Sequence, residues 1–124
     1  MVFKENNKAI YLQIADGICD SVMTGTVEEG GRIPSVREYA ATLQVNANTV
    51  MRSYEHLTQE GVLFNKRGIG FFVAEDARAR ISKMRHEAFF NGEIQEFFRQ
   101  LNLLGISPDE LTEHYVKYLK EIEK

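Results

Sequence analysis

Residues 33–61 read IPSVREYAATLQVNANTVMRSYEHLTQEG and contain two helix starts in quick succession. The first is at Ser35, whose hydroxyl can accept a hydrogen bond from the amide of Glu38, while the Glu38 carboxylate reaches back to the amide of Ser35 in a capping box. This pattern predicts a helix from Val36 to about Leu43. A second capping residue, Asn46, follows after a short break and predicts another helix. Two helices joined by so tight a turn are typical of a helix-turn-helix.

The second of these helices has one apolar face and one polar face. At about 100° per residue, Val50, Tyr54 and Leu57 fall within about 40° of one another, so we expect them to face the core. The positions that then face outward are Asn48, Thr49, Arg52, His56 and Gln59. Asparagine and arginine carry the donors and acceptors that match adenine and guanine edges in the major groove of DNA. The polar face therefore predicts a recognition helix that enters DNA with its first turns.

Another helix and a loop are predicted ahead of this pair. From about Lys8 to Thr24 an apolar residue recurs at every fourth position, which is typical of an amphipathic helix. The apolar positions are Ile10, Ile14, Ile18 and Val22, joined by Tyr11 and Ala15. Gly25 is suited to end this helix. Residues 26–33 lack periodicity and predict a loop, in which Val27 is a candidate for a short edge strand.

A β-hairpin is predicted after the helix pair. Residues 62–64 and 69–73 are rich in residues that favour strands, and the turn Asn65-Lys66-Arg67-Gly68 separates them with a basic tip. The order helix, helix, turn, helix, hairpin is typical of a winged helix-turn-helix, to which we assign residues 1–75 as a DNA-binding domain. The predicted fold class is α+β, mainly α: an N-terminal winged helix-turn-helix followed by a C-terminal helical dimerisation tail at residues 76–124.

The tail carries more aromatic side chains than two helices can cover. A long helical stretch, either one helix bent near Asn91-Gly92 or two separate helices, precedes the capping box Ser107-Pro108-Asp109-Glu110, which starts a last helix. We expect a second copy of the chain to cover the remaining apolar surface. The predicted dimerisation residues are Phe89, Phe90, Phe97, Phe98, Tyr115 and Tyr118. The alternative is that these side chains pack on the chain's own winged helix.

Composition narrows the classes of function. Hydrophobic residues make up 44% of the 124 residues and charged residues 27%, as in soluble globular proteins. No apolar run is long enough to cross a bilayer and no secretion signal precedes the first helix, so we expect no membrane partner and a cytoplasmic location. The single cysteine, Cys19, and three scattered histidines predict no disulfide, no metal site, no cofactor and no catalytic residues.

The charge is segregated along the chain. A net charge of -3 by itself argues against a nucleic-acid partner, because affinity for nucleic acid comes largely from cations that neutralise phosphates. From Arg32 to Val73, however, five basic residues stand against three acidic ones, a local balance of +2. The predicted helix-turn-helix and hairpin are therefore the basic part of an acidic chain.

Several residues in this basic part are candidates for contacts with DNA. Arg37 lies one turn from the start of its helix, where the free amides near Ser35 and the positive end of the helix dipole favour a phosphate oxygen. Lys66 and Arg67 at the hairpin tip are expected to reach the neighbouring groove or the backbone. Gly68 lets the main chain turn tightly and approach DNA closely.

Taken singly, these residues have ordinary explanations. Arg52 alone is a surface arginine on a solvated helix face, Lys66 and Arg67 are common turn residues, and Asn46 is a helix cap first. Their joint placement on one predicted surface favours DNA binding.

Three short motifs follow one another along the region from Ile10 to Val73. They are Ile33-Pro34-Ser35-Val36-Arg37-Glu38, then Asn48-Thr49-Val50 with Tyr54, Leu57 and Glu60-Gly61, then Arg67-Gly68-Ile69-Gly70-Phe71-Phe72-Val73. These motifs resemble the DNA-binding domain of the GntR family of bacterial regulators. The resemblance implies DNA contacts from Arg37, Asn46, Asn48, Thr49, Arg52, Arg67 and Gly68. Ala47 departs from the pattern, because many family members carry arginine there, and Glu29-Gly30 replaces a frequent Pro-Gly.

Only 48 residues follow Asp76, too few to enclose a sizeable metabolite pocket. The short tail resembles the YtrA subfamily, whose tails dimerise and whose members often repress operons for membrane transport systems. The resemblance implies a homodimeric repressor that binds a palindromic double-stranded DNA operator, with an unknown effector. Two other classes stay open: a winged-helix module that binds protein and not DNA, and a regulator with a small ligand between dimer tails, stacked on Tyr115 or Tyr118.

Overall fold

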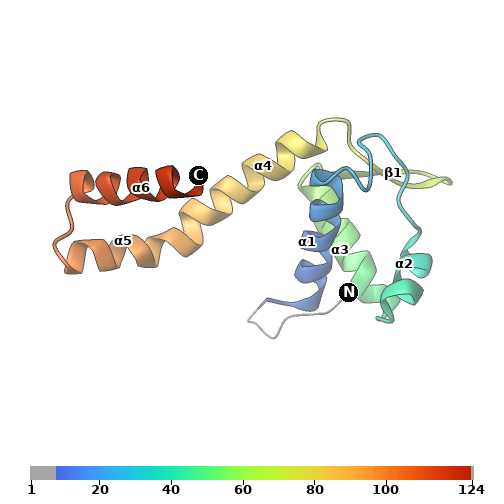
Figure 1. Cartoon of the computed structure of the whole chain (residues 1–124). Helices are drawn as coiled ribbons and strands as arrows, with labels where there is room; N and C mark the ends of the chain where they lie inside the picture. Colours follow the sequence, from blue (N-terminus) through green and yellow to red (C-terminus); the bar gives the residue numbers. More distant parts are fainter. Residues whose placement is uncertain (1–7, 124) are drawn as a thin grey trace. The chain divides into compact units, whose positions relative to one another are not determined.

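The computed structural model describes residues 8–123, which fall into two compact units divided between Met84 and Arg85. In chain order the elements are α1 (Ile10–Met23), α2 (Val36–Leu43), α3 (Ala47–Gln59), β1 (Leu63–Lys66), β2 (Gly70–Val73), α4 (Ala77–Ala88), the π-helix η1 (Phe89–Glu93), α5 (Ile94–Leu103) and α6 (Pro108–Ile122) (Figure 1). The helices with one small antiparallel sheet confirm the predicted class, α+β and mainly α.

The core of the first unit forms around α1 and α3, which pack against each other. From α1 it takes Ile14, Ile18 and Val22, three positions of the predicted apolar stripe. Ile10, the fourth position, is about half exposed, because the buried cluster does not extend to the first turn of α1. Ile81, from α4, is fully buried in the same cluster. The first unit therefore closes its own core.

The starts of α2 and α3 follow from their capping residues. The Ser35 hydroxyl accepts a hydrogen bond from the amide of Glu38 (3.1 Å), and the amide of Ser35 donates to the Glu38 carboxylate (3.2 Å), which is the predicted capping box. α2 ends where Gln44 adopts the left-handed conformation at φ 58°. The side chain of Asn46 then caps α3 by accepting from the amide of Asn48 (2.8 Å).

The inward face of α3 is the one that its sequence predicts. The exposed fractions of Val50, Tyr54 and Leu57 are 0%, 1% and 0%. The Tyr54 hydroxyl donates a hydrogen bond to the carbonyl of Pro34 (2.8 Å), which ties α3 to the segment just before α2. Burial raises the pKa of Tyr54, so this hydroxyl stays protonated and remains a donor.

The hairpin has a longer first strand, a shorter second strand and a later, shorter turn than its sequence predicts. The two strands pair antiparallel, with Lys66 opposite Gly70 at the end of the ladder. Asn65 and Lys66 therefore belong to β1, whereas the sequence placed both in the tip. The turn at residues 67–69 is closed by Gly68, whose φ of +79° is unfavourable for other residues.

A third segment lies against the hairpin. Arg32 forms an isolated antiparallel bridge with Phe72 of β2, and backbone hydrogen bonds on either side of it join residues 30–33 to the same strand. The prediction of an edge strand at Val27 is wrong, because the amide of Val27 donates to the carbonyl of Ser21 in α1 (3.1 Å) instead. A one-residue bridge has no alternating pattern that a sequence could show.

The second unit is a helical hairpin in which α5 and α6 run side by side (Figure 1). η1 joins α4 to α5 at the position of the predicted bend. α6 begins where predicted, with Pro108 in its first turn and with the Ser107 hydroxyl accepting from the amide of Glu110 (3.1 Å), which is one of the two hydrogen bonds of the predicted capping box. Within the described part of η1, α5 and α6, no side chain is buried.

Candidate nucleic-acid interface

The first turns of α3 present polar side chains opposite its buried face. Asn48 is exposed and Thr49 is partly exposed, as their outward positions predict. The side-chain oxygen of Asn46 is already used to cap α3. At the start of α3, Asn48 is therefore the residue whose side-chain amide is best placed to reach a base edge.

Arg52 is exposed, but its guanidinium has a partner within the chain. The guanidinium carbon lies 4.2 Å from the centre of the Tyr11 ring, which comes from α1. His56 packs edge-on against the same ring at 6.2 Å, and the Ser53 hydroxyl donates to the Tyr11 carbonyl (2.7 Å). This stack holds Arg52 on the α1 side of α3 and limits the directions in which it can reach DNA. The sequence predicted Tyr11 only as an apolar position of its helix and gave no sign of its contact with Arg52.

The start of α2 is less open to a phosphate than its sequence predicts. Ser35 and Glu38 already satisfy one another's backbone amides. Hydrogen bonds from the side chain and the amide of Ser35 lower the pKa of Glu38, so the carboxylate is charged and contributes a negative potential at this helix end. Arg37, which is exposed, is then the group on this helix best suited to meet a phosphate.

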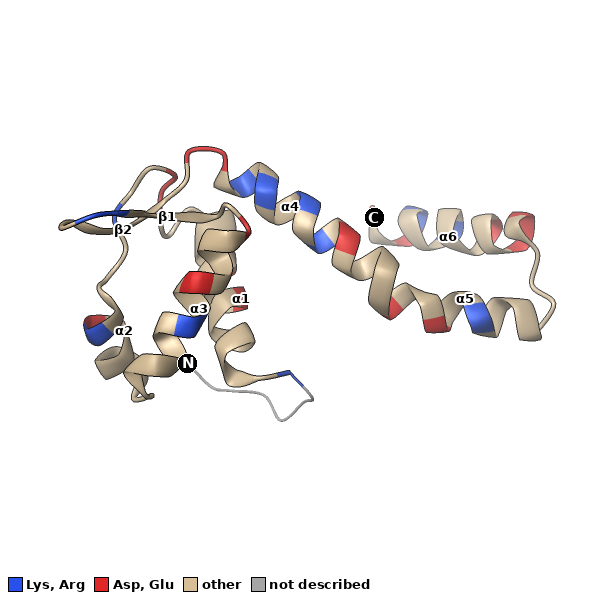
Figure 2. Cartoon of the chain, turned by 180° about the vertical axis from the view of Figure 1, so that it is seen from behind, with Lys and Arg blue, Asp and Glu red and all other residues tan. Residues whose placement is uncertain are grey.

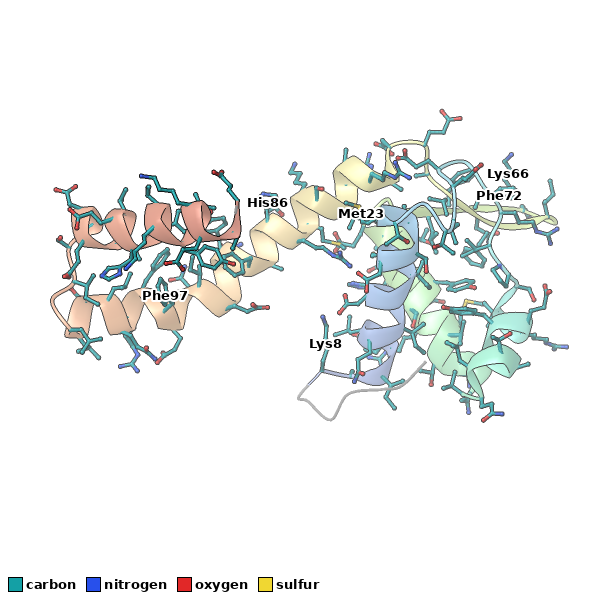
Figure 3. The ribbon with its side chains drawn as sticks, in the orientation of Figure 1. Lys8, Met23, Lys66, Phe72, His86 and Phe97 are labelled. Atoms are coloured by element: carbon teal, nitrogen blue, oxygen red, sulfur yellow. The ribbon has the colours of Figure 1, made fainter. Side chains whose placement is uncertain are left out.

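One basic side chain of the hairpin, Lys66, lies on an aromatic platform. The rings of Phe64 and Phe72 stack across the two strands at 5.7 Å. The ammonium nitrogen of Lys66 lies over them, 4.6 Å from the Phe72 ring centre and 5.8 Å from that of Phe64 (Figure 3). Arg67 and Gly68 follow in the turn and are exposed. The hairpin of residues 63–73, the wing of this fold, therefore presents Lys66 on an aromatic support and Arg67 in the exposed turn beyond it.

Arg32 is a functional candidate that sequence reasoning missed. Its guanidinium donates a hydrogen bond to the carbonyl of Ile69 in the hairpin turn (2.9 Å). It also packs so closely on Gly70 that a Cβ atom there would lie 3.3 Å from Nε. In the sequence Arg32 counted only as one positive charge, because nothing local indicates a partner 37 residues away.

Basic residues of the first unit lie on the hairpin, on α2 and on α3, and also on α4, which carries Arg78, Arg80 and Lys83 (Figure 2). A shallow groove of about 480 Å³ between α3 and the hairpin is lined by Met51, Glu55, Thr58, Gln59, Asn65 and Phe71. Its one charged side chain is the acidic Glu55, so a phosphate is better placed beside Arg37 or the wing than within this groove.

All nine residues predicted to contact DNA thus lie in the first unit, on α2, α3, their caps and the wing. They are Ser35, Arg37, Asn46, Asn48, Thr49, Arg52, Lys66, Arg67 and Gly68. Their individual contacts stay predictions.

Residues 10–73 match the model of the family described as bacterial regulatory proteins, gntR family. The chain belongs to the GntR family. GntR proteins are DNA-binding transcription regulators and not enzymes. Membership in the family therefore agrees with the exposed polar face of α3 in assigning the chain as a regulator.

The similarity to individual GntR relatives extends into the second unit. The HTH-type transcriptional regulator YhcF of Bacillus subtilis (strain 168), itself uncharacterized, is 34% identical over 88% of each chain. The HTH-type transcriptional repressor YtrA of the same strain is 27% identical over 91% of this chain and 83% of its own. A solved structure of a GntR-family transcriptional regulator from Bacteroides thetaiotaomicron is 56% identical, with a TM-score of 0.81 over 91% of this chain and 98% of that one. The short tail is thus shared with YtrA-like GntR regulators, as its length predicted.

The second unit of this GntR protein has an apolar groove of about 780 Å³ between α5, α6 and η1. Its lining includes five of the six aromatic residues predicted to dimerise: Phe89, Phe90, Phe97, Phe98 and Tyr115. Phe97 projects from α5 toward α6 (Figure 3). The sixth, Tyr118, is exposed outside this lining.

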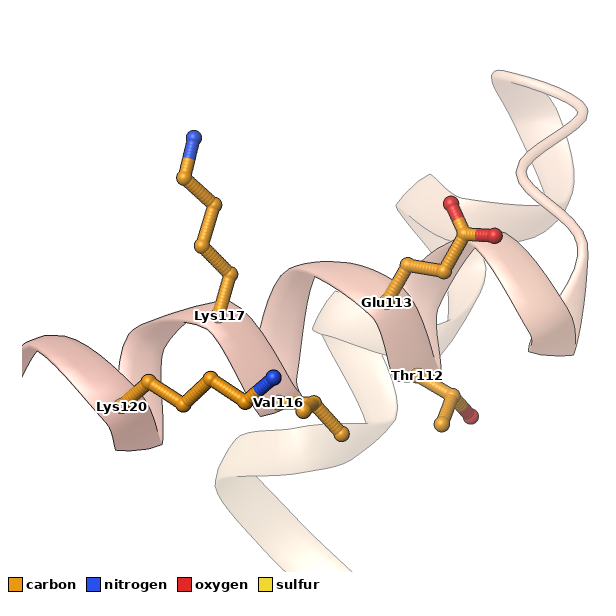
Figure 4. A pocket seen from close by; sticks show the side chains of 5 residues that line it. All are labelled: Thr112, Glu113, Val116, Lys117 and Lys120. Atoms are coloured by element: carbon orange, nitrogen blue, oxygen red, sulfur yellow. The ribbon is translucent and has the colours of Figure 1, made fainter.

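Two further features of the described residues bear on other functions. A shallow hollow of about 390 Å³ lies along α6, where Glu113, Lys117 and Lys120 make its lining charged (Figure 4). Between residues 8 and 123 no histidine, cysteine and carboxylate side chains cluster in a way that suits a metal ion. In the same range no helix has the length and apolar character needed to span a bilayer.

Proposed function

We propose that this GntR protein is a cytoplasmic homodimeric repressor that binds a palindromic operator, with one α3 helix in the major groove of each half-site. The observation that carries this proposal is the polar side of α3 at Asn48 and Arg52, which the burial of Val50, Tyr54 and Leu57 leaves turned outward. A two-fold operator follows from a symmetric dimer that presents the same helix twice.

Each predicted residue has a role in this complex. Asn48, Thr49 and Arg52 contact base edges, and Asn46 holds the helix start in position. Ser35 and Arg37 contact a phosphate beside α2. Lys66, Arg67 and Gly68 bring the wing against the neighbouring groove or backbone. The operator contacts thus come from residues 1–75, the proposed DNA-binding domain.

The proposed dimerisation tail is residues 76–124. Its support is energetic, since no side chain in the described part of η1, α5 and α6 is buried while six large aromatic residues are exposed. Fully burying one large apolar side chain contributes about 1.5 to 3 kcal/mol, so covering the apolar groove with a second copy is strongly favourable. The tail thereby sets the spacing of the two recognition helices.

The proposed target is an operon of the transporter type. The similarity to YtrA, a transcriptional repressor, over nearly the whole chain supports the role as a repressor. The transporter-type operon is what the resemblance of the short tail to the YtrA subfamily implies. This assignment determines which genes a binding experiment should include.

The test is a gel shift with duplexes that the wild-type protein selects from a random-sequence pool. Arg52→Ala should weaken binding by about 1 to 3 kcal/mol and relax the preference at one base pair per half-site. Arg37→Ala should weaken binding to all duplexes alike and reduce the salt slope by about one per half-site. Lys117→Ala removes an exposed cation from α6 and serves as the control, with unchanged affinity expected.

Two results would count against the proposal. If the wild-type protein binds no duplex as the ionic strength is lowered, DNA binding itself is wrong. If it binds but Arg52→Ala keeps full affinity and preference, Arg52 is not a base contact.

A further inference from the structure

The tip of the wing combines basic neighbours with an exposed apolar side chain. Ile69 keeps 56% of its surface exposed in the turn between β1 and β2, next to Lys66 and Arg67. Its amide donates to the carbonyl of Lys66 (2.9 Å) and closes the turn. Among the described residues, Ile69 is not one of the apolar side chains that pack on the core of the first unit. An isoleucine at this place contributes nothing to the core and lies where the wing would first meet DNA.

The main chain at Ile69 is fixed from outside the hairpin. The Arg32 guanidinium donates to the Ile69 carbonyl (2.9 Å) and packs on the backbone of Gly70. Arg32 is itself joined to β2 by its bridge with Phe72. A charge-assisted hydrogen bond to a turn carbonyl restrains the direction of the tip before any ligand binds, which lowers the entropy cost of binding.

We propose that Ile69 is an apolar contact of the wing with the minor groove and that Arg32 is the positioning residue that holds it there. The proposal rests on the proposed function, because it requires that the wing binds duplex DNA. The minor groove at an A·T pair lacks the guanine amino group, so an apolar side chain can approach its floor more closely there than at a G·C pair. Ile69 therefore gives the protein a preference for A·T pairs at the wing position, while Lys66 and Arg67 contact the flanking phosphates.

The test measures affinity by fluorescence anisotropy on a duplex selected by the wild-type protein, in which hydroxyl-radical footprinting locates the base pairs under the wing. Three duplexes are then compared, which carry A·T, inosine·cytosine or G·C at these base pairs and are otherwise identical. Inosine·cytosine presents the minor groove of A·T and the major groove of G·C, so it separates the two grooves. The wild-type protein should bind the first two duplexes equally and the G·C duplex roughly five- to tenfold more weakly.

Ile69→Ala should lower affinity for the A·T duplex by roughly five- to tenfold and remove most of the preference over G·C, because its apolar contact area is lost. Met23→Ala is the matched control, since Met23 is an exposed apolar residue outside the wing, and its affinity and preference should stay at the wild-type values. Thermal unfolding of each variant checks that the first unit stays folded.

The role of Arg32 is tested by a double-mutant cycle. If Arg32 acts through the tip, Arg32→Ala combined with Ile69→Ala should bind within about twofold of Ile69→Ala alone, and Arg32→Ala should leave the salt slope unchanged. A salt slope reduced by about one per half-site would show that Arg32 contacts a phosphate itself and would overturn its positioning role.

The outcomes separate this proposal from the proposed function. If the wild-type protein binds its selected duplex and Ile69→Ala keeps both affinity and A·T preference, the apolar contact is wrong and the regulator assignment stands. If the wild-type protein discriminates inosine·cytosine from A·T, the preference arises in the major groove and Ile69 is not its source. If the wild-type protein binds no DNA, the proposed function fails first.

Discussion

Both units of the chain consist largely of helices that carry apolar side chains, yet only the first unit buries these side chains. In that unit α1 and α2 both pack against α3, and Val50 and Leu57 are fully buried. In the second unit η1, α5 and α6 leave an apolar groove open between them, so Phe97 and Phe98 remain 45% and 41% exposed. The difference shows that an apolar stripe predicts a buried face but not which molecule buries it. A helix pair with one uncovered groove needs a further layer, and we propose that a second copy supplies it.

Phe97→Glu should have the largest effect, because it puts a charge into the apolar groove of the second unit. We expect a monomer by sedimentation equilibrium. The affinity for a full operator should fall by roughly 10²- to 10⁴-fold, since the two half-sites are no longer bound by linked recognition helices.

The control for this change is Asn102→Asp, which adds a negative charge at an exposed polar position of the same helix and should stay dimeric. A dimeric Phe97→Glu protein with unchanged operator affinity would show that the groove is not the dimer interface.

Leu57→Ala should have the next largest effect, because it opens a cavity in the core that the first unit closes by itself. The free energy of unfolding should fall by about 2 to 5 kcal/mol in urea titrations, by the same amount at low and high protein concentration. Leu104→Ala, at a residue that is 73% exposed, should change it by less than about 0.5 kcal/mol. If the decrease in the free energy of unfolding grows as the protein is diluted, the stability of the first unit also depends on dimerisation.

Tyr54→Phe should destabilise the first unit less than Leu57→Ala. The ring stays buried, but the carbonyl of Pro34 loses the hydroxyl that donates to it at 2.8 Å. Because Pro34 is exposed and its carbonyl can bond to water instead, losing this partly buried hydrogen bond should cost about 0.5 to 1.5 kcal/mol, measurable in the same titrations. Tyr115→Phe, in the exposed groove of the second unit, should leave the free energy of unfolding nearly unchanged. If Tyr54→Phe and Tyr115→Phe lower the free energy of unfolding by equal amounts, the two units do not differ in how they bury their tyrosines.

Glu38→Gln should have the smallest effect, and that effect should depend on pH. The hydrogen bonds with Ser35 lower the pKa of Glu38 below its ordinary value of 4.5, so the charged carboxylate stabilises the folded state at pH values above 4.5. That stabilisation is lost as the pH falls through the lowered pKa. The stability difference between wild type and Glu38→Gln should therefore shrink on acidification, and Ser35→Ala should weaken this dependence. A difference that stays constant with pH would contradict the capping role of the charge.

The helix boundaries were predictable because helix starts are local. Ser35, Asn46 and Ser107 each bond to an amide two or three residues further along, so the sequence contains both partners within one turn. The hairpin was predicted with its tip two residues too early, because strand composition does not fix where cross-strand pairing stops. The edge strand at Val27 was wrong because pairing at Arg32 depends on a strand far along the chain.

The candidate site was predictable in outline and not in its contacts. The burial of Tyr54 and its neighbours follows from helical periodicity, which also turns Asn48 and Arg52 outward. Periodicity does not show that Arg52 stacks on Tyr11, since the two residues lie on different helices. Neither does a count of charges show that Arg32 holds the tip of the wing.

The amino-acid sequence by itself determined the order of the elements, the inward face of α3 and the membership in a family of DNA-binding regulators. These properties depend on caps, periodicity and short motifs, whose parts lie close together in the chain. Only the tertiary structure decided that Arg32 braces Ile69, that Lys66 lies over Phe64 and Phe72, and that the aromatic groove of the tail stays open. The physical reason is that each depends on side chains brought together by packing, whose energies no single segment contains.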